Sequence, residues 1–215
     1  MFGAQVATHI LACRVFMTYK VECHELSPDE WLRLREIRLA SLQDSPDAFG
    51  GNHQRESEFS ELEWRELFTK NTYLVATLNG KDIAMMFLEK LRGDFGATCW
   101  VGGCWSNPQY RGTGALRAMF NYVDSVAEEK GWQIQGLGVF VVNESAIAAY
   151  EKLGFKAMGE VQESTRKPGN FYQRYNLRKK SGLSSGGTIL PLRRRRPFPL
   201  GRPAIIQARE LATPI

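Results

Sequence analysis

The stretch that most restricts the fold of this chain is Asn107–Arg117, NPQYRGTGALR, in which Gly112 and Gly114 stand just before a helix-like run. The apolar, strand-like residues 97–106 precede it. A strand, a glycine-rich turn and a helix N-terminus together form an anion site. The first N–H groups of the helix have no partner there, and glycine lets a ligand approach the backbone closely. The sequence therefore indicates an α/β domain with a phosphate-type turn.

The spacing of the turn excludes two common nucleotide-binding motifs. A P-loop needs Lys after its last glycine, whereas Ala115 follows Gly114. A dinucleotide-binding turn needs a third glycine, whose place Arg117 takes, and the following WQIQGLG segment supplies no acid. From the spacing alone, the turn either holds another phosphorylated ligand or is a helix start that binds nothing.

Alternating hydrophobic periodicities between residues 20 and 178 predict a mixed sheet with helices. Cap residues mark three helix starts, and an Asn-Gly pair marks a hairpin turn. A helix that joins two strands makes them parallel neighbours through a right-handed crossover, which we expect for residues 97–105 and 133–142. The expected helices span 28–43, 60–69, 115–130 and 144–153, and the expected strands span 19–26, 72–78, 82–91, 97–106, 132–142, 155–163 and 171–177.

Charge divides the chain into three parts. Residues 179–215 carry eight Lys or Arg and one acid, a net charge of +7, which leaves −2 for the rest of a chain whose total is +5. We therefore expect a folded domain over 19–178 and a basic, disordered tail over 179–215. Residues 1–18 are an N-terminal extension, and Gln5 and His9 interrupt its apolar stretch, which argues against a signal peptide.

The cysteines bear on metal binding and location. Cys13, Cys23, Cys99 and Cys104 show no CxxC spacing and no neighbouring His cluster, so we expect reduced thiols, no metal and a cytoplasmic protein. No apolar run approaches the roughly 20 residues that span a membrane, so we expect no membrane partner.

Two separate segments resemble the GNAT acetyltransferase superfamily. Gln109–Gly114, QYRGTG, matches the Q/R-x-x-G-x-G/A signature, and Asn143–Phe155, NESAIAAYEKLGF, resembles the N-x-x-A-x-x-x-Y-x-K-x-G-F segment. The resemblance implies an α/β (α+β type) GNAT fold. Its central sheet is mixed and mostly antiparallel, with about seven strands, a splayed parallel pair and about four flanking helices.

The resemblance also implies acetyl-CoA as the acetyl donor and assigns roles to residues. Tyr150 would protonate the departing CoA thiolate, although a tyrosine in a short amphipathic helix can equally be a core residue. Glu89 is our candidate for the general base, with His53, Glu144 and Glu163 as rivals. The implied cofactor-binding residues are Cys104, Trp105, Ser106, Gln109, Arg111, Gly112, Thr113, Gly114, Ala115, Asn143 and Lys152.

The function that follows is an acyltransferase that moves an acetyl group from acetyl-CoA to a primary amine of a small molecule or peptide by direct attack. Residues 44–54, 91–97 and 163–171 would build the acceptor pocket. The alternative is a catalytically inactive GNAT-fold binding module whose basic tail contacts nucleic acid. We expect a monomer or a homodimer.

Overall fold

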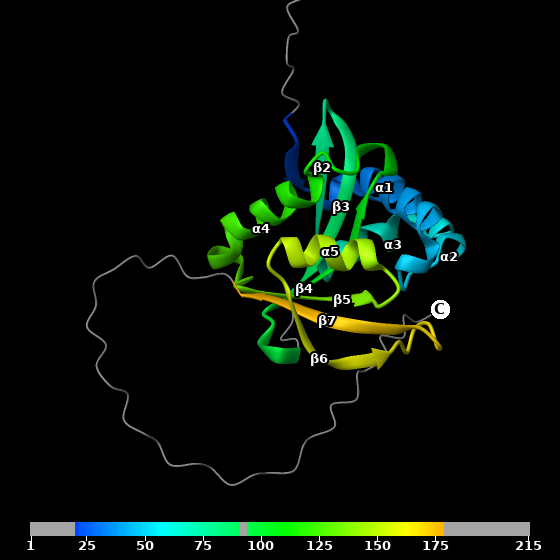
Figure 1. Cartoon of the computed structure of the whole chain (residues 1–215). Coiled ribbons are helices and arrows are strands. Elements are labelled where there is room, and N and C mark those ends of the chain that lie inside the picture. Colours follow the sequence, from blue (N-terminus) through cyan, green and yellow to red (C-terminus); the bar gives the residue numbers. More distant parts are fainter. Residues whose placement is uncertain (1–19, 91–93, 179–215) are drawn as a thin grey trace, which may run out of the picture. The chain divides into compact units, whose positions relative to one another are not determined.

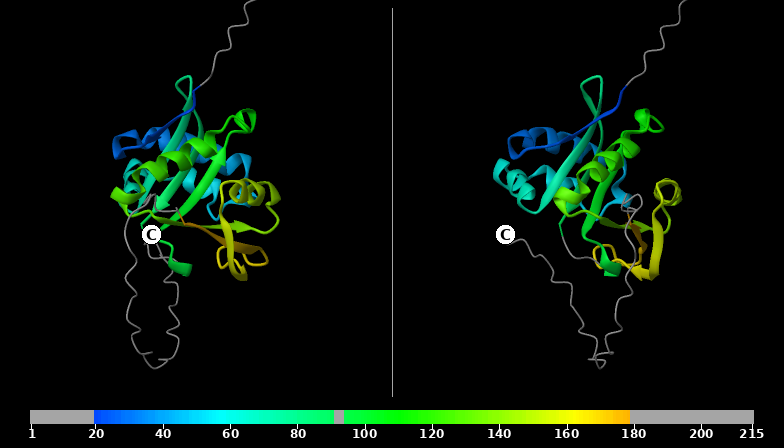
Figure 2. Two further views of the ribbon diagram at one scale, coloured as in Figure 1. Left: turned by 60° about the vertical axis from the view of Figure 1, so that its left-hand side comes forward. Right: turned by 90° about the vertical axis from the view of Figure 1, so that its left-hand side faces the viewer.

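The computed structural model describes residues 20–90 and 94–178, so the predicted extension and basic tail lie outside the described residues. Within these ranges the chain forms one seven-stranded sheet with the order β1-β2-β3-β4-β5-β7-β6, flanked by five α-helices (Figures 1 and 2). Only β4 and β5 pair in parallel, as expected. The strands are β1 Glu22–Glu25, β2 Asn71–Leu78, β3 Lys81–Glu89, β4 Cys99–Ser106, β5 Ile134–Phe140, β6 Lys156–Glu163 and β7 Phe171–Arg178; the helices are α1 Trp31–Asp44, α2 His53–Ser57, α3 Glu61–Glu66, α4 Ala115–Lys130 and α5 Glu144–Lys152.

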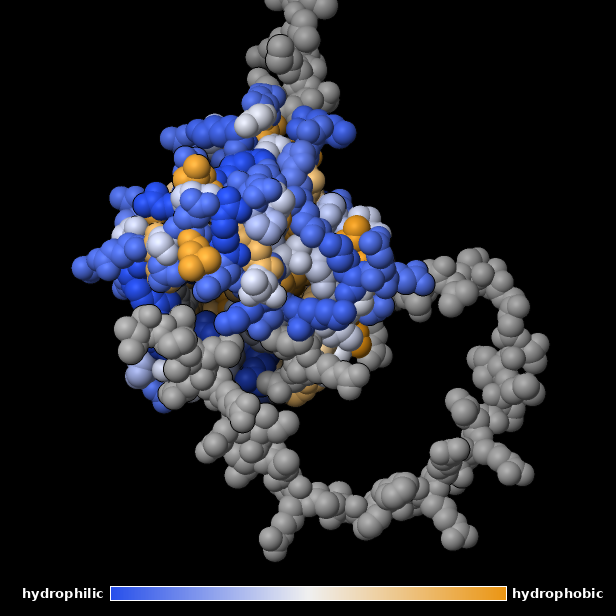
Figure 3. Space-filling model, turned by 180° about the vertical axis from the view of Figure 1, so that it is seen from behind, coloured by the Kyte–Doolittle hydropathy of each residue, from blue (hydrophilic) through white to orange (hydrophobic). Residues whose placement is uncertain are grey.

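Two hydrophobic cores cover opposite faces of the sheet. Leu74 and Ala76 of β2 belong to the core that contains α4 and α5, whereas Tyr73 and Val75 belong to the core that contains α1 and α3. Successive residues of a strand point to opposite faces, so both faces of β2 are buried. Seen from behind in Figure 3, the outer surface is mostly hydrophilic, with hydrophobic residues in scattered spots.

Local signals in the sequence account for several element boundaries. The Ser60 N–H donates to Glu63 at 2.7 Å, and the rings of Phe59 and Trp64 meet edge-on at 5.6 Å, which confirms the predicted start of α3. Asn79 and Gly80 both have positive φ, as the tight turn of the β2–β3 hairpin requires.

Two helix predictions need correction. Helix α1 begins at Trp31 rather than residue 28, because the Glu30 N–H bonds to the Ser27 carbonyl three residues back and forms a 3₁₀ turn. The sequence predicts no helix over His53–Ser57, where the structure has a fifth helix, α2. It begins where the Asn52 side chain accepts the Arg55 N–H at 3.0 Å.

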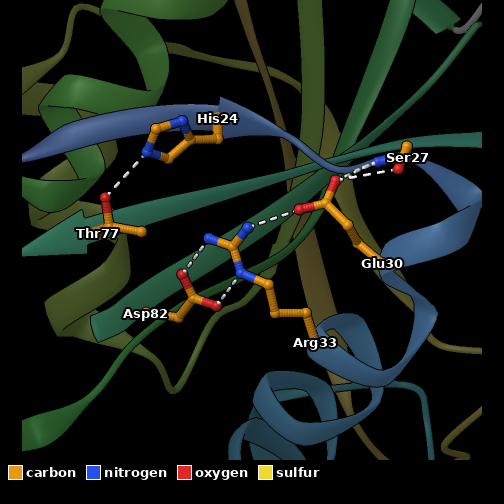
Figure 4. Close-up of polar contacts among 6 residues, drawn as sticks. All are labelled: His24, Ser27, Glu30, Arg33, Thr77 and Asp82. Carbon is orange, nitrogen blue, oxygen red and sulfur yellow. Dashed lines mark hydrogen bonds and ion pairs between the residues drawn. The ribbon is translucent and has the colours of Figure 1, made fainter. Parts of the chain in front are cut away.

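A cluster of charged side chains ties α1 to the sheet (Figure 4). Arg33 donates from Nε and Nη2 to the two carboxylate oxygens of Asp82 at 2.8 Å each, and from Nη1 to Glu30 at 2.7 Å. The hydrogen bonds to Asp82 raise the pKa of Arg33. On the neighbouring strands, His24 and Thr77 share a hydrogen bond of 3.1 Å. This cluster fixes α1 over β3.

The parallel strands β4 and β5 separate soon after they meet. Their pairing is recorded at only two positions, Cys99 with Gln135 and Trp100 with Gly136. Beyond these, Gly103 adopts φ +61° and the β3–β4 register shifts, which is a bulge that bends β4. The predicted splayed pair is confirmed, and the edge of β4 that faces β5 is open beyond Trp100.

Candidate active site

A cavity of about 700 Å³ lies beside the open edge of β4. Its wall is made by the end of β4, the turn and first residues of α4, one face of α5 and the loop between α1 and α2. That volume is within the usual range for small-molecule sites. The wall contains ten of the predicted site residues: Cys104, Trp105, Ser106, Arg111, Gly112, Gly114, Ala115, Asn143, Tyr150 and Lys152.

One end of the cavity is suited to anions. Gly112 and Gly114 have φ +80° and +90°, a left-handed conformation that glycine adopts without strain. In the described part of the chain, the N–H groups of Gly112, Ala115 and Leu116 have no backbone acceptor. They lie at the N-terminus of the 16-residue helix α4, whose dipole favours negative charge.

Two unpaired cations also line the cavity, among the residues that the structure describes. Arg117 and Lys152 are exposed and form no recorded ion pair within those residues. The sequence interpretation assigned Lys152 but missed Arg117. Arg117 takes the place of a third glycine in the first turn of α4. That position, next to the glycine-rich turn, could have indicated a phosphate-binding side chain.

Gln109 and Thr113 are not part of the cavity wall. The Thr113 hydroxyl and N–H both bond to the Tyr110 carbonyl, at 2.7 and 3.3 Å, and the Gln109 N–H bonds to Asn107 at 3.0 Å. Both residues therefore shape the turn from within. Their predicted contact with a cofactor finds no support in this placement.

The cavity wall also contains a buried tyrosine. Tyr150 is only 8% exposed, and its ring packs edge-on against Phe120 and Phe155. Cys104 is the neighbouring group that acts most on its hydroxyl. Burial, and then Cys104, raise the pKa of Tyr150 well above its usual value, and burial raises the pKa of Cys104 to about 11. Both groups are therefore neutral near pH 7, and Tyr150 can act as a proton donor to sulfur.

Helix α5, which carries Tyr150 and Lys152, is capped at both ends. Asn143 is the cap at its N-terminus. Its side chain accepts the Ala146 N–H at 3.2 Å, so it caps α5 as the sequence predicts. At the other end, Gly154 has φ +98° and terminates the helix in the predicted left-handed conformation. These caps hold Tyr150 and Lys152 at fixed positions along the cavity.

No side chain in the described cavity wall is Asp, Glu or His, so the wall itself supplies no carboxylate or imidazole base. Glu89 lies at the end of β3 opposite Trp100, on the same face of the sheet as that residue. Glu163 accepts the Gly169 N–H at 2.7 Å and closes the β6–β7 connection. His53 and Glu144 begin α2 and α5. The structure brings none of these candidates into the cavity.

Residues 44–54 and 163–171, two of the three segments expected at the acceptor pocket, meet next to the cavity. Lys167 Nζ donates to the Pro46 carbonyl at 2.7 Å, and a Cβ built on Gly50 would lie 3.1 Å from Cδ of Arg166. The same 44–54 segment lines the cavity through Ser45, Ala48 and Phe49. Of the third segment, residues 91–93 lie outside the description.

A mixed sheet with a split parallel pair, and a cavity whose wall contains a phosphate-type turn and a buried tyrosine, fit an acyltransferase. The family model described as "Acetyltransferase (GNAT) family" matches residues 31–155. The chain belongs to the GNAT acetyltransferase family.

Solved structures agree on the fold. A GNAT-family acetyltransferase from Streptococcus pneumoniae is 18% identical, with a TM-score of 0.59 over 74% of this chain and 99% of its own. A putative acetyltransferase from Acinetobacter baylyi is also 18% identical, with a TM-score of 0.61 over 80% of this chain and 98% of its own. RimL, a ribosomal L7/L12 α-N-protein acetyltransferase in complex with coenzyme A, is 10% identical, with a TM-score of 0.58 over 74% of this chain and 93% of its own. A search of curated proteins found no match.

Within residues 20–90 and 94–178, none of the helices combines the length and the apolar character needed to cross a membrane. Within the same ranges, no group of three or more His, Cys, Asp or Glu side chains could hold a metal ion.

Proposed function

We propose that the protein transfers the acetyl group of acetyl-CoA to a primary amine by direct attack. The observation that carries this proposal is one cavity whose wall contains both the unpaired N–H groups at the start of α4 and the side chain of Tyr150. Acetyl-CoA has a group for each, with phosphates at one end and a thioester at the other. The inactive binding module is not supported by any of these features, and its basic tail lies outside the described residues.

The chain offers a place for each part of the donor. The N–H groups of Gly112, Ala115 and Leu116 would bind the pyrophosphate, with the cations of Arg111, Arg117 and Lys152 around them. The amide-rich pantetheine arm would pair with the open edge of β4 at Cys104–Ser106. A backbone N–H near Trp105 or Ser106 would then polarise the thioester carbonyl.

In the chemical step, the nitrogen of the neutral amine attacks the thioester carbon and forms a tetrahedral oxyanion. Collapse of this intermediate breaks the C–S bond, and the sulfur takes the proton of Tyr150, which solvent then restores. The raised pKa of Tyr150 keeps its hydroxyl protonated, as this role requires. Glu89 remains our candidate for removing the amine proton; because it lies outside the cavity wall, it would act through water.

Two measurements test the proposal. Acetyl-CoA and CoA should raise the melting temperature, because a ligand at 100 times its Kd stabilises the folded state by about 2.7 kcal/mol. A thiol-release assay with acetyl-CoA should then identify acceptors in a panel of small amines and peptides. Peptide α-amines belong in the panel because RimL acts on a protein α-amine. An unchanged melting curve with both ligands would remove the proposal.

A further inference from the structure

Asp44 occupies a position that its own helix disfavours. It is the last residue of α1, where the helix dipole repels a carboxylate, and the last turn of α1 has no basic residue. Nevertheless its pKa is lowered, first by a hydrogen bond from Trp105, then by Ser45 and by the charge of Arg111. The carboxylate is therefore stabilised by groups from beyond α1.

One carboxylate oxygen of Asp44 accepts three hydrogen bonds. Its Oδ2 accepts from Trp105 Nε1 at 2.9 Å, from Arg111 Nη2 at 3.1 Å and from the Ser45 hydroxyl at 2.7 Å. The three donor residues all line the cavity, whereas Asp44 does not. Asp44 thus stands behind the wall and joins the end of β4, the phosphate-type turn and the α1–α2 loop.

Arg111 is held on two sides by this arrangement. Besides its bond to Asp44, its Nε donates to the Ser106 carbonyl at 3.3 Å, although its side chain is 59% exposed. Nη1 has no recorded partner in the described part of the chain and is available to a phosphate. A flexible side chain that is ordered before binding loses less entropy when the ligand arrives.

We infer that Asp44 is a positioning residue that holds Arg111 ready for the cofactor phosphates and Trp105 at the thioester end of the same cavity. This inference rests on the proposed function, because it assumes acetyl-CoA as the occupant. The affinity for the nucleotide part of the cofactor would then depend on Asp44, although Asp44 does not touch the cofactor.

The test measures the Kd for CoA by titration calorimetry for the wild type and for Asp44→Ala, Arg111→Ala and the double variant. We expect each single variant to raise the Kd about tenfold. The Kd of the double variant should be within about twofold of that of Arg111→Ala, because Asp44 acts on CoA binding through Arg111 and the two losses are therefore not additive. Asp44→Asn keeps an oxygen for Trp105 but loses the charge. It should raise the KM for acetyl-CoA and leave kcat within about twofold, whereas Asp44→Ala should also lower kcat.

Asp82→Ala is the matched control, because Asp82 also anchors an arginine between α1 and the sheet but lies outside the cavity wall (Figure 4). It should leave the Kd for CoA unchanged. S-acetylpantetheine, which lacks the phosphates, should lose no affinity on Asp44→Asn.

The outcomes separate the two proposals. If the wild type does not bind CoA, the proposed function fails. If it does, the role of Asp44 is overturned by an unchanged Kd in Asp44→Ala, by losses that multiply in the double variant, or by tighter binding, which would mean that Asp44 competes with the phosphates.

Discussion

At the scale of single residues, Tyr150 carries the most direct prediction. Tyr150→Phe keeps the ring packing against Phe120 and Phe155 but removes the proton donor, so kcat should fall about 100-fold or more. The Kd for CoA should stay within about twofold, since the phosphate end is untouched. Tyr122→Phe is the control, because the Tyr122 hydroxyl bonds to Glu25 away from the cavity. An equal kcat in the wild type and in Tyr150→Phe would show that Tyr150 is not the proton donor.

The raised pKa of Tyr150 predicts the shape of the pH profile. A general acid works only while protonated, that is, below its pKa, and burial moves the pKa of Tyr150 above the usual value of about 10. Between pH 8 and pH 9.5, kcat should therefore hold level or rise as the acceptor amine loses its proton. Steady-state rates with saturating acetyl-CoA measure this. A decline over this range in the wild type that Tyr150→Phe lacks would contradict the assignment.

Not every residue of the site could be predicted from the sequence. Gly112, Gly114 and Asn143 were predictable, because their roles follow from local backbone geometry: left-handed turns and a helix cap. Arg117 was not predicted as a site residue, and Asp44 was predicted only as part of the 44–54 segment of the acceptor pocket. Asp44 meets Trp105 across 61 positions of sequence, and only the tertiary packing of α1 on β4 brings them together.

At the scale of secondary-structure elements, the pair Arg38–Glu56 explains why α2 stays on α1. Their atoms approach to 2.8 Å, and the side chains are only 14% and 7% exposed. Glu56→Ala should therefore cost about 3 kcal/mol of unfolding free energy, because it leaves the Arg38 charge buried without its partner. Chemical denaturation measures this cost.

The control for this pair lies on the next helix. Arg65 and Glu61 approach to 2.7 Å, but their side chains are 35% and 56% exposed. Glu61→Ala should therefore cost less than about 1 kcal/mol, since water screens the pair. Similar losses for Glu56→Ala and Glu61→Ala would show that burial does not set the strength of the α1–α2 contact.

The sequence predicted elements best where the signal was local. The Ser60–Glu63 box and the Asn79–Gly80 turn each lie within a few residues, and both are present. Helix α2 has only five residues and was missed, because so short a helix depends on packing, here the Arg38–Glu56 pair, more than on its own periodicity. The splay of β4 from β5 came from the family resemblance, and Gly103 supplies its physical cause.

At the scale of the whole molecule, the prediction concerns the limits of the folded domain. The seven described strands, the two cores and the described part of the cavity wall lie within residues 20–178. The predicted domain limits, 19–178, stay a prediction, as do the oligomeric state and the cytoplasmic location. A shortened protein tests the limits directly.

A chain of residues 19–178 should keep its melting temperature within about 3 °C of the full chain, a change below about 1 kcal/mol, and should show the same upward shift with CoA. The deletion removes nine positive charges and one negative charge, so the net charge changes from +5 to −3. The full chain should therefore bind a cation exchanger at pH 7 and low salt, while the shortened chain should pass through it. A lost CoA shift in a shortened chain that still melts cooperatively would mean that one of the ends belongs to the cofactor site, and the domain limits would then be wrong.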